Sequence, residues 1–329
     1  MFKNKKILIT GGTGSLGTAL TKRLLDTDVN VIRIFSRDEW KQVQMQEQFD
    51  SKKLRFLIGD IRDKERLSRA MEDIDIVFHA AALKHVPVAE YNPFEAIKTN
   101  VLGAQNVIEA SLYNNVNKVI AIGTDKAVSP LNTYGATKLL MERMMTAANF
   151  IKGKHKTDFL SVRYGNVLGS RGSVLPKFIE QVKKGQDLTI TDPKMTRFNI
   201  TMKQAIDLIF RAFSNGKSGE VFVPKLKAYT VMELKDAIIE LTDYKGKVKK
   251  IQVRPGEKFH ETLINQEEIA HTFESKEDYI IRSTGVDEFS DIKSRCLTKV
   301  KFTNPYSSDK VPIIRKDELK KIIQKENFL

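Results

Sequence analysis

A glycine-rich turn directly after a short apolar run limits the possible folds of this chain more than any other feature. Residues 6–10 (KILIT) form the apolar run, and residues 11–17 (GGTGSLG) follow with a G-x-x-G-x-x-G spacing. Glycine lets the backbone turn sharply and approach a pyrophosphate closely, and the N-terminus of a following helix offers unpaired N–H groups. A plain strand-to-helix turn is the alternative. We predict that the following residues bind a dinucleotide: Gly11, Thr13, Gly14, Ser15, Leu16 and Gly17.

The first 160 residues alternate short β-branched runs with longer amphipathic stretches, a pattern typical of parallel strands joined by crossover helices. The predicted strands are residues 6–10, 30–35, 54–58, 74–79, 118–122 and 158–162. The predicted helices are residues 15–26, 39–48, 63–72, 93–114 and 132–152. Near-continuous apolar strands of this length suit a sheet that is covered on both faces. The pattern therefore predicts an α/β fold with a Rossmann-type doubly wound parallel sheet.

The rhythm changes after Tyr164, where stretches containing Gly and Pro separate single helices, predicted at residues 176–184 and 202–214. A chain of 329 residues with 41% hydrophobic content can form about two domains. We predict a Rossmann domain over residues 1–164 and a smaller α/β substrate-binding domain over residues 165–329. The second domain can include segments that return to the first. A basic helical tail at residues 315–326 is expected to present a solvated face.

Positive charge is concentrated in one region of the chain. The formal net charge is +14, and residues 151–258 alone hold 22 basic and 11 acidic side chains. These basic residues are neither gathered in one tract nor interleaved with aromatic residues, as they would be in a nucleic-acid-binding segment. We therefore expect a small phosphorylated ligand and no nucleic acid.

The single cysteine, Cys296, permits no internal disulfide, and the N-terminus lacks the layout of a signal peptide, so a cytoplasmic location is expected. The longest apolar stretches are far too short to span a bilayer, so no membrane association is expected. The five histidines and the cysteine show no metal-ligand spacing, which predicts that no metal is bound. His79, inside a predicted strand, is expected to be a core residue.

The end of the second predicted strand indicates which dinucleotide is bound. NAD-preferring Rossmann domains place an acid there for the ribose 2′-hydroxyl, whereas this chain has Ser36 and Arg37, with Lys41 one helical turn further on. Basic side chains suit a 2′-phosphate, so NADP is the predicted cofactor. Two solvated charges at the start of a helix are the alternative, since Asp38 is adjacent. Further cofactor contacts are predicted after the third and fourth strands, at Asp60, Ile61, Ala80, Ala81 and Ala82.

Tyr134 and Lys138 form a Y-x-x-x-K pair on a predicted helix, where a spacing of four places both side chains on one face. A nearby ammonium favours the phenolate and so lowers the pKa of the tyrosine. Such a tyrosine can take a proton from a sugar hydroxyl while hydride leaves the same carbon for nicotinamide. An exposed helix pair is the alternative interpretation, but the position after a glycine turn and a fifth strand favours catalysis.

With these motifs in place, the sequence resembles the extended short-chain dehydrogenase/reductase superfamily, and within it the inverting UDP-N-acetylglucosamine 4,6-dehydratases of pseudaminic-acid biosynthesis. The matching segments run along nearly the whole chain and weaken after about residue 265. They are GGTGSLG (11–17), FSRDEWKQ (35–42), GDIRD (59–63), HAAALKHVPVAEYNP (79–93), KTNVLGAQNV (98–107), TDKAVSPLNTYGATK (124–138), RYGNVLGSRGSVLP (163–176), MTRF (195–198) and RPGEK (254–258).

The segment Thr124-Asp125-Lys126 separates this group from its relatives in chemistry. Retaining sugar-nucleotide dehydratases resemble Thr-Asp-Glu at this place, whereas the inverting group resembles Thr-Asp-Lys. The resemblance implies oxidation at C4, loss of water across C5 and C6, and return of the hydride to C6. Lys126, crowded by Lys138 and partly desolvated, is expected to have a lowered pKa that suits the C5 step, with Asp125 as the acid at O6. Without that context, Asp125 and Lys126 would equally suit an ordinary charge pair at a strand end.

The resemblance also implies contacts to the UDP-sugar. Lys84 follows the fourth strand, where a cation approaches both cofactor and sugar; a surface lysine is the alternative. Arginine suits diphosphate oxygens and glutamate can accept from hydroxyls. The other predicted substrate contacts are Asn166, Val167, Arg171, Val174, Arg254 and Glu257.

The leading hypothesis is thus an NADP-dependent, C5-inverting UDP-N-acetylglucosamine 4,6-dehydratase, which the family resemblance implies to be a homo-oligomer. A UDP-hexose 4-epimerase is the second hypothesis, and it needs neither an acid at O6 nor a base at C5. A non-catalytic NADP-binding protein of the same fold is the third. Whether Tyr134 shares the reprotonation of C5 with Lys126 is left open by the sequence.

Overall fold

The structure is a computed structural model that describes residues 1–170, 172–282, 292 and 294–329. A ten-stranded sheet in the order β15-β13-β14-β9-β6-β5-β4-β1-β2-β3 forms its centre. The parallel part contains β1 (Lys6–Thr10), β2 (Val31–Ser36), β3 (Leu54–Ile58), β4 (Ile76–His79), β5 (Lys118–Ile122) and β6 (Asp158–Val162). The order reverses between β1 and β4, so the predicted Rossmann-type sheet is confirmed.

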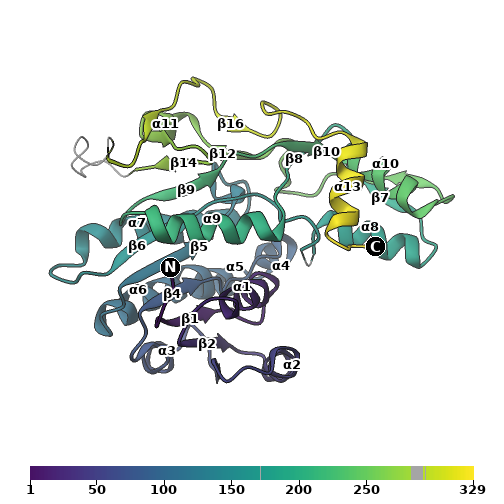
Figure 1. The fold of residues 1–329 in the computed structure, drawn as a ribbon. Helices are drawn as coiled ribbons and strands as arrows, with labels where there is room; N and C mark the ends of the chain where they lie inside the picture. The colour runs from purple at the N-terminus through teal and green to yellow at the C-terminus, as the bar shows by residue number, and fades with distance from the viewer. Residues whose placement is uncertain (171, 283–291, 293) are drawn as a thin grey trace.

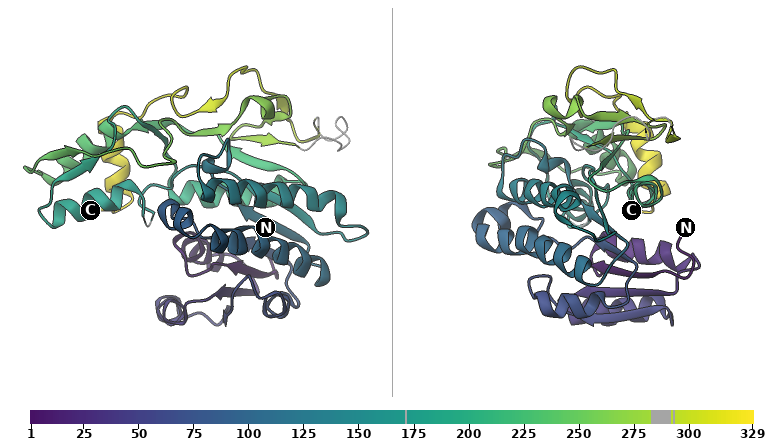
Figure 2. Two further views of the ribbon diagram at one scale, coloured as in Figure 1. Left: turned by 180° about the vertical axis from the view of Figure 1, so that it is seen from behind. Right: turned by 90° about the vertical axis from the view of Figure 1, so that its left-hand side faces the viewer.

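Helices cover both faces of this sheet, which explains why its strands are apolar throughout. Leu20 and Leu24 of α1 and Ile209 of α9 belong to the core on one face, and α3, α6 and α7 build the core on the other face. Figure 1 shows α1 and α9 in front of the sheet, and Figure 2 shows the opposite face. The helices of the first half are α1 (Ser15–Leu25), α2 (Glu39–Phe49), α3 (Lys64–Met71), α4 (Val86–Tyr91), α5 (Pro93–Ile97), α6 (Gly103–Tyr113) and α7 (Thr133–Ile151).

The predicted helix at residues 93–114 is composite. α5 begins at Pro93, a π-helical turn η1 (Lys98–Leu102) follows, and α6 continues from it. Asn100 of η1 explains the irregular turn, because its side-chain amide exchanges hydrogen bonds with the backbone N–H and C=O of Leu83 at 2.8 and 2.9 Å. This contact holds the loop after β4, which the sequence pattern alone could not show.

The chain after β6 returns to the sheet and also builds a separate lobe. β9 continues the sheet parallel to β6, and β14, β13 and β15 extend it with antiparallel pairing. Helices α8, α10 and α13 share a third core and form the lobe at the right of Figure 1. The helices here are α8 (Val174–Lys183), α9 (Met202–Asn215), α10 (Val231–Thr242), α11 (Gln266–Ile269) and α13 (Lys316–Lys325). The strands are β7 (Leu188–Ile190), β8 (Thr196–Phe198), β9 (Val221–Pro224), β10 (Ala228–Thr230), β11 (Val248–Lys250), β12 (Thr262–Ile264), β13 (Thr272–Glu274), β14 (Asp278–Ile281), β15 (Thr298–Lys299) and β16 (Tyr306–Ser307).

A buried ion cluster joins the two halves behind the site. Arg163, just after β6, donates to Glu142 of α7 (Nε to Oε2, 3.1 Å) and to Glu268 of α11 (Nη1 to Oε2, 2.9 Å). Burial disfavours its charge, but the two carboxylates raise the pKa of Arg163 above its ordinary value. Removing one member would leave an unpaired buried charge, so this cluster fixes α7 relative to the later segments.

Candidate active site

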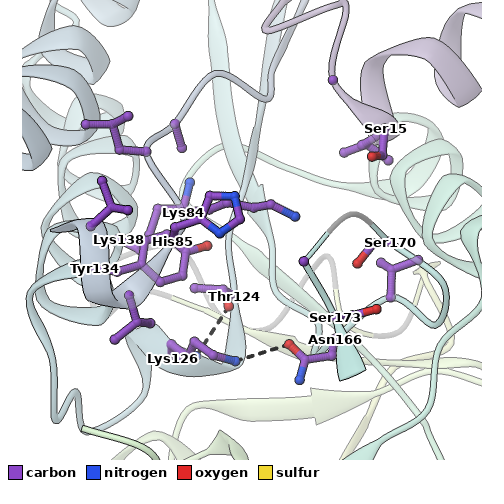
Figure 3. A pocket seen from close by; sticks show the side chains of 18 of the residues that line it. Ser15, Lys84, His85, Thr124, Lys126, Tyr134, Lys138, Asn166, Ser170 and Ser173 are labelled. Atoms are coloured by element: carbon purple, nitrogen blue, oxygen red, sulfur yellow. Dashed lines mark hydrogen bonds between the residues drawn. The ribbon is translucent and has the colours of Figure 1, made fainter. Parts of the chain in front are cut away.

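One large cavity lies at the carboxyl ends of the parallel strands, where open α/β sheets bind ligands. Its volume is about 1280 Å³, and segments from both halves of the chain line it. Every predicted site residue that the structure describes lines this cavity, except Asp125. Arg171 lies outside the described residues. Figure 3 shows Tyr134 and Lys138 on one side of the view, with Asn166, Ser170 and Ser173 on the other.

The glycine turn is built for close approach of a ligand to the backbone. Gly11 has φ +66°, and a Cβ added there would lie 2.7 Å from the Cα of Ala81. A Cβ on Gly17 would lie 2.4 Å from the carbonyl oxygen of Gly12. Gly14 caps α1 without a side-chain hydrogen bond, so the first N–H groups of the helix face the cavity wall. These features fit the pyrophosphate of a dinucleotide.

Charged side chains surround the end of β2. Arg37 Nη1 lies 3.6 Å from Asp60 Oδ2, and Lys41 forms an ion pair with Asp38. Ser36 Oγ accepts a hydrogen bond of 3.0 Å from Gln42. The two cations are therefore already next to carboxylates, but their side chains are half exposed and free to reorient toward a phosphate.

Tyr134 and Lys138 are buried on the first turns of α7, where Asn132 caps the helix by accepting from Gly135 N at 2.8 Å. Burial raises the pKa of Tyr134, and the nearest opposing charge is the ammonium of Lys126. The expectation that Lys138 lowers this pKa is therefore wrong. Lys138 Nζ lies 3.1 Å from Met141 Sδ, and burial lowers the pKa of Lys138 to about 8.

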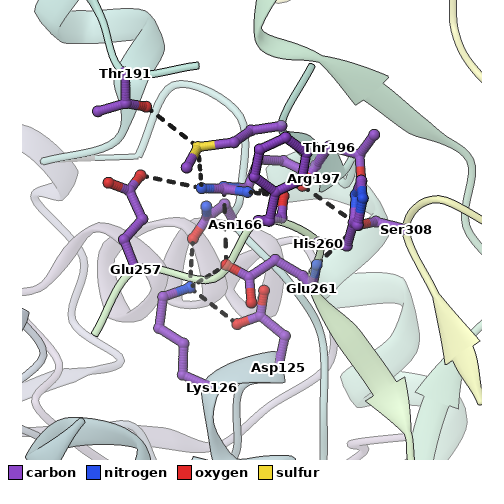
Figure 4. A network of polar contacts seen from close by, with 12 residues as sticks. Asp125, Lys126, Asn166, Thr191, Thr196, Arg197, Glu257, His260, Glu261 and Ser308 are labelled. Atoms are coloured by element: carbon purple, nitrogen blue, oxygen red, sulfur yellow. Dashed lines mark hydrogen bonds and ion pairs between the residues drawn. The ribbon is translucent and has the colours of Figure 1, made fainter. Parts of the chain in front are cut away.

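Lys126 is the centre of the polar contacts on the cavity wall. Its Nζ lies 3.1 Å from Asp125 Oδ1, 3.2 Å from Asn166 Oδ1 and 3.6 Å from Glu261 Oε1 (Figure 4). Burial disfavours the ammonium, but the charges of Asp125 and Glu261 outweigh it and raise the pKa of Lys126. The expected lowering is thus wrong, because two carboxylates face this amine in place of Lys138.

Asp125 stands behind Lys126 rather than in the cavity wall. Its side chain is 1% exposed, and its Oδ1 accepts from Thr124 Oγ1 at 2.8 Å. Its backbone N–H donates to the carbonyl of Tyr164 at 3.1 Å, which fixes the short 3₁₀ turn η2 (Asp125–Ala127) against the end of β6. Asp125 therefore holds Lys126, and the side chains of Thr124 and Lys126 face the cavity.

Later segments of the chain also line the cavity. Arg197 Nη2 lies 3.0 Å from Glu257 Oε1, and its Nε lies 3.8 Å from Glu261 Oε1. Lys177 of α8 also lines the cavity, and burial together with the nearby Arg254 guanidinium lowers its pKa. Two neighbouring cations on one wall favour an anionic ligand.

Three wall residues were missed by sequence reasoning. Glu261 lies three residues beyond the RPGEK segment, Arg197 lies inside the MTRF segment, and Lys177 follows the loop at 163–176. In the sequence, only their position inside or next to the segments that carry the family resemblance indicates that they line the site. His85, next to Lys84, is a fourth lining residue, and its Cε1 lies 2.8 Å from where a Cβ of Gly172 would stand.

The described residues contain no cluster of three or more potential metal ligands. His79 is fully buried, and its Nδ1 lies 2.8 Å from Thr10 Oγ1. None of the helices in the described parts of the chain is long and apolar enough to cross a membrane.

Comparison with known proteins places the chain among sugar-modifying enzymes. A family model described as polysaccharide biosynthesis protein matches residues 7–283. A UDP-N-acetylglucosamine 4,6-dehydratase (inverting) from Campylobacter jejuni is 48% identical over 95% of this chain and 95% of its own length. A UDP-glucose 4-epimerase from Rickettsia massiliae is 42% identical over 98% of this chain and 96% of its own length.

Solved structures share the fold. The X-ray structure of Pen from Bacillus thuringiensis has a TM-score of 0.94 and 42% identity, with 100% of both chains covered. The dTDP-glucose 4,6-dehydratase DesIV from Streptomyces venezuelae, solved with NAD and TYD bound, has a TM-score of 0.71 and 21% identity, over 77% of this chain and 87% of that chain. At that lower identity the likeness shows the fold alone.

Proposed function

Since this chain belongs to the polysaccharide biosynthesis protein family, we propose that it is a UDP-N-acetylglucosamine 4,6-dehydratase that inverts C5. The product is then UDP-2-acetamido-2,6-dideoxy-β-L-arabino-hex-4-ulose. One observation carries this proposal. Lys126, in the Thr-Asp-Lys segment after β5, lies between two carboxylates in the cavity that Tyr134 also lines. The printed name of the Campylobacter relative supports the same activity.

A nicotinamide dinucleotide is the cofactor that fits the glycine turn. When bound, it would supply the hydride acceptor for oxidation at C4 and the hydride donor for reduction at C6. Gly11, Gly14 and the first turn of α1 would hold its pyrophosphate. Arg37 and Lys41 support NADP over NAD, because a 2′-phosphate is a stronger partner for them than the carboxylates they now contact. NAD, as in the DesIV structure, is the alternative.

Tyr134 is our candidate for the base that accepts the proton of the C4 hydroxyl. Its phenol lines the cavity, and the positive charge of Lys126 opposes the rise in its pKa that burial causes. A phenolate can accept the C4 hydroxyl proton as the carbonyl forms. Lys138, on the same helix face, also lines the cavity and is our candidate for a contact to the cofactor.

The elimination is assigned to the cluster around Lys126. Once C4 is a ketone, the C5 proton is acidic, and a base at C5 and an acid at O6 complete the loss of water. Lys126 serves C5, and Asp125 fixes its amine through the 3.1 Å contact. Because its pKa is raised, Lys126 rests as an ammonium and must release its proton before it can act as a base.

The UDP moiety is assigned to the wall that carries Arg254, Lys177 and Glu257. The excess of positive charge on residues 151–258 supports a diphosphate there. Asn166, Val167 and Val174 line the adjacent part of the cavity and are our candidates for contacts to the sugar. Lys84 lies at the mouth of the same cavity, on an exposed loop, and is proposed to contact both ligands.

A UDP-hexose 4-epimerase is the second candidate, and the printed name of the Rickettsia relative favours it. Epimerisation at C4 uses the same cofactor and the same tyrosine, but it leaves C5 and C6 untouched. It therefore gives no role to a partly buried Lys126 held by two carboxylates, and the dehydratase is the better supported of the two.

The experiment that separates these functions is mass spectrometry of the product formed from UDP-N-acetylglucosamine. The dehydratase gives a product lighter by one water, whereas an epimer keeps the mass of the substrate. An unchanged mass, with the substrate isomerised at C4, would contradict the proposal.

Three further expectations stay predictions. A homo-oligomer is supported by exposed apolar side chains on neighbouring helices, including Phe94 of α5, Leu102 of η1 and Leu140 of α7. The role in pseudaminic-acid biosynthesis rests on the family resemblance. The cytoplasmic location rests on the single cysteine of the sequence.

A further inference from the structure

Glu261 is a buried carboxylate in the active-site wall that the proposed mechanism does not yet use. Its side chain is 3% exposed, yet it lines the cavity together with Lys126 and Tyr134. One of its oxygens, Oε1, lies 3.6 Å from Lys126 Nζ and 3.8 Å from Arg197 Nε. The other, Oε2, is buried and has no hydrogen-bond partner among the described residues. A buried polar atom without a partner in a ligand cavity calls for a functional explanation.

The backbone around Glu261 is held firmly. Its N–H donates to Ser308 Oγ at 2.9 Å, and Ser308 N donates back to the carbonyl of Glu261 at 2.8 Å. Ser308 Oγ also lies 2.6 Å from Thr196 Oγ1 of β8. β12 begins at the next residue and pairs with β16. The side chain is therefore presented to the cavity by a rigid framework, which catalytic groups require.

Glu261 and Asp125 differ in their access to a substrate. Both approach Lys126, but Asp125 is absent from the cavity wall and also binds Thr124. Its own partnerless oxygen, Oδ2, faces the backbone of Gly165, where an added Cβ would lie 3.3 Å away. A group that delivers a proton to a sugar oxygen must reach that oxygen within hydrogen-bond distance. Of these two carboxyls, only Glu261 lies in the wall.

We propose, building on the dehydratase function, that Glu261 is the catalytic acid that protonates O6, and that Asp125 is a positioning residue for Lys126. Glu261 first takes the proton of the Lys126 ammonium, which approaches from its ion-pair distance of 3.6 Å. The neutral amine then removes the C5 proton, and the C5–H electron pair forms the C5=C6 double bond. The C6–O6 bond breaks as Glu261 gives its proton to O6, which leaves as water. Lys126 ends as an ammonium and Glu261 as a carboxylate, so both return to their starting states.

The electrostatics of the cluster agree with this exchange. Burial raises the pKa of Glu261, and the charge of Asp125 raises it further, while Lys126, Arg197 and Lys258 oppose the rise. Two carboxylates that share one ammonium favour a proton on one of them. Arg197 also contacts Glu257, at 3.0 Å, so its positive charge is shared between Glu257 and Glu261.

The test compares two leaving groups in the wild type and in two isosteric variants. The 6-hydroxyl group of UDP-N-acetylglucosamine leaves as water only if an acid protonates O6. The 6-deoxy-6-fluoro analogue loses fluoride without that proton. For Glu261→Gln, we expect water loss to fall by about 100-fold or more. Fluoride release, followed with a fluoride electrode, should fall at least tenfold less than water loss, because Asp125, 3.1 Å from the Lys126 amine, can still take the proton of Lys126 in this variant. Asp125→Asn should impair both leaving groups equally, because it acts through Lys126. Glu267→Gln, an exposed neighbour on α11, is the surface control.

Equal losses for both leaving groups in Glu261→Gln would overturn the assignment, since a structural role gives no preference for fluoride. A selective recovery with fluoride in Asp125→Asn would overturn it in favour of Asp125. If Glu261→Gln does not fold, Glu261→Asp keeps an acid on a shorter side chain, and the same selective loss of water elimination is expected. A wild type that eliminates from neither substrate would overturn the dehydratase function, and the inference with it.

Discussion

Lys126 Nζ lies 3.2 Å from Asn166 Oδ1, and this contact joins the loop after β5 to the loop after β6. Because the same amine contacts Asp125 and Glu261, the raised pKa of Lys126 is a property of the assembled site. Lys126 is thus held as a charged group in the wall of the cavity.

Replacing Lys126 should separate oxidation from elimination. In Lys126→Ala, C4 oxidation should continue, while water loss and deuterium entry at C5 fall by about 100-fold or more, because the amine at C5 is gone. Lys126→Arg keeps the charge but holds its proton permanently, so it should be equally impaired. Product mass and C5 deuterium content measure both. An arginine variant that eliminates at the wild-type rate would show that the charge alone suffices.

Tyr134→Phe should stop the reaction before elimination. The variant keeps the buried ring but loses the phenol that accepts the C4 hydroxyl proton, so transient absorbance of the reduced cofactor and turnover should both disappear. Binding of the UDP-sugar should be retained, as measured by calorimetry. Tyr113→Phe, an exposed position on α6, serves as the matched control. Persistent absorbance in Tyr134→Phe would contradict the assignment of this step.

Arg37→Ala should weaken binding of NADP more than binding of NAD. Loss of one charge-assisted hydrogen bond to a 2′-phosphate costs about 1.5 to 3 kcal/mol, which is about 10- to 150-fold in Kd. Arg62→Ala is the control, because Arg62 also contacts Asp60, at 2.7 Å, but does not line the cavity. Titrations of both cofactors give the Kd values. Equal losses for NADP and NAD in Arg37→Ala would be inconsistent with a 2′-phosphate contact.

Arg254→Ala should raise KM for the UDP-sugar by about tenfold or more, because it removes charge-assisted bonds to the diphosphate. The rate at saturating substrate should change much less, because Arg254 is assigned to the diphosphate and not to the proton transfers around Lys126. Lys250→Ala removes a nearby exposed cation that pairs with Asp192, at 3.2 Å, and does not line the cavity. Initial-rate kinetics compare the two variants. An unchanged KM in Arg254→Ala would place this residue outside the substrate site.

His79 should make the protein less stable in acid. Burial, together with the charge of Lys138, lowers the pKa of His79 to about 3. Between this value and its ordinary pKa, the unfolded chain binds a proton that the folded protein does not. The contribution of His79 to the free energy of unfolding is therefore present in full above its ordinary pKa of about 6.5. This contribution declines as the pH falls toward 3.

The size of this effect follows from the same linkage. From pH 7 to pH 5, His79 should account for a loss of about 2 kcal/mol in the free energy of unfolding. His79→Asn, which keeps a polar partner for Thr10, should show a smaller loss over this range even if it is less stable at pH 7. Denaturant titrations at both pH values measure the difference. The same pH dependence in both proteins would contradict this account.

The parallel half of the fold was predictable because its signals are local. Apolar β-branched runs define β1 to β6 to within two residues, and the glycine turn marks the start of α1. The later strands gave no such signal. β13 and β14 have three and four residues, and they are strands because they pair with each other and with β9 at the edge of the large sheet. Pairing between segments that are distant in the chain leaves no pattern in a short stretch of sequence.

The candidate site divides in the same way. Residues on strand-to-helix turns, such as Gly11 and Tyr134, were predicted from motifs and line the cavity. The pKa of Lys126 was predicted with the wrong sign, because the charge of Asp125, next to it in the chain, and that of Glu261, 135 positions later, together outweigh the effect of burial. Only the fold brings Glu261 close. Local motifs therefore predict which groups are present, and the fold determines their charge states.

The most direct test of the proposed activity is NMR of the product formed from UDP-N-acetylglucosamine in D2O. This one measurement reports the loss of water, the configuration at C5 and the exchange of the C5 proton with solvent. The account predicts a 4-keto-6-deoxy sugar of L-arabino configuration with deuterium at C5. A D-xylo product, or a 4-epimer that has lost no water, would contradict it.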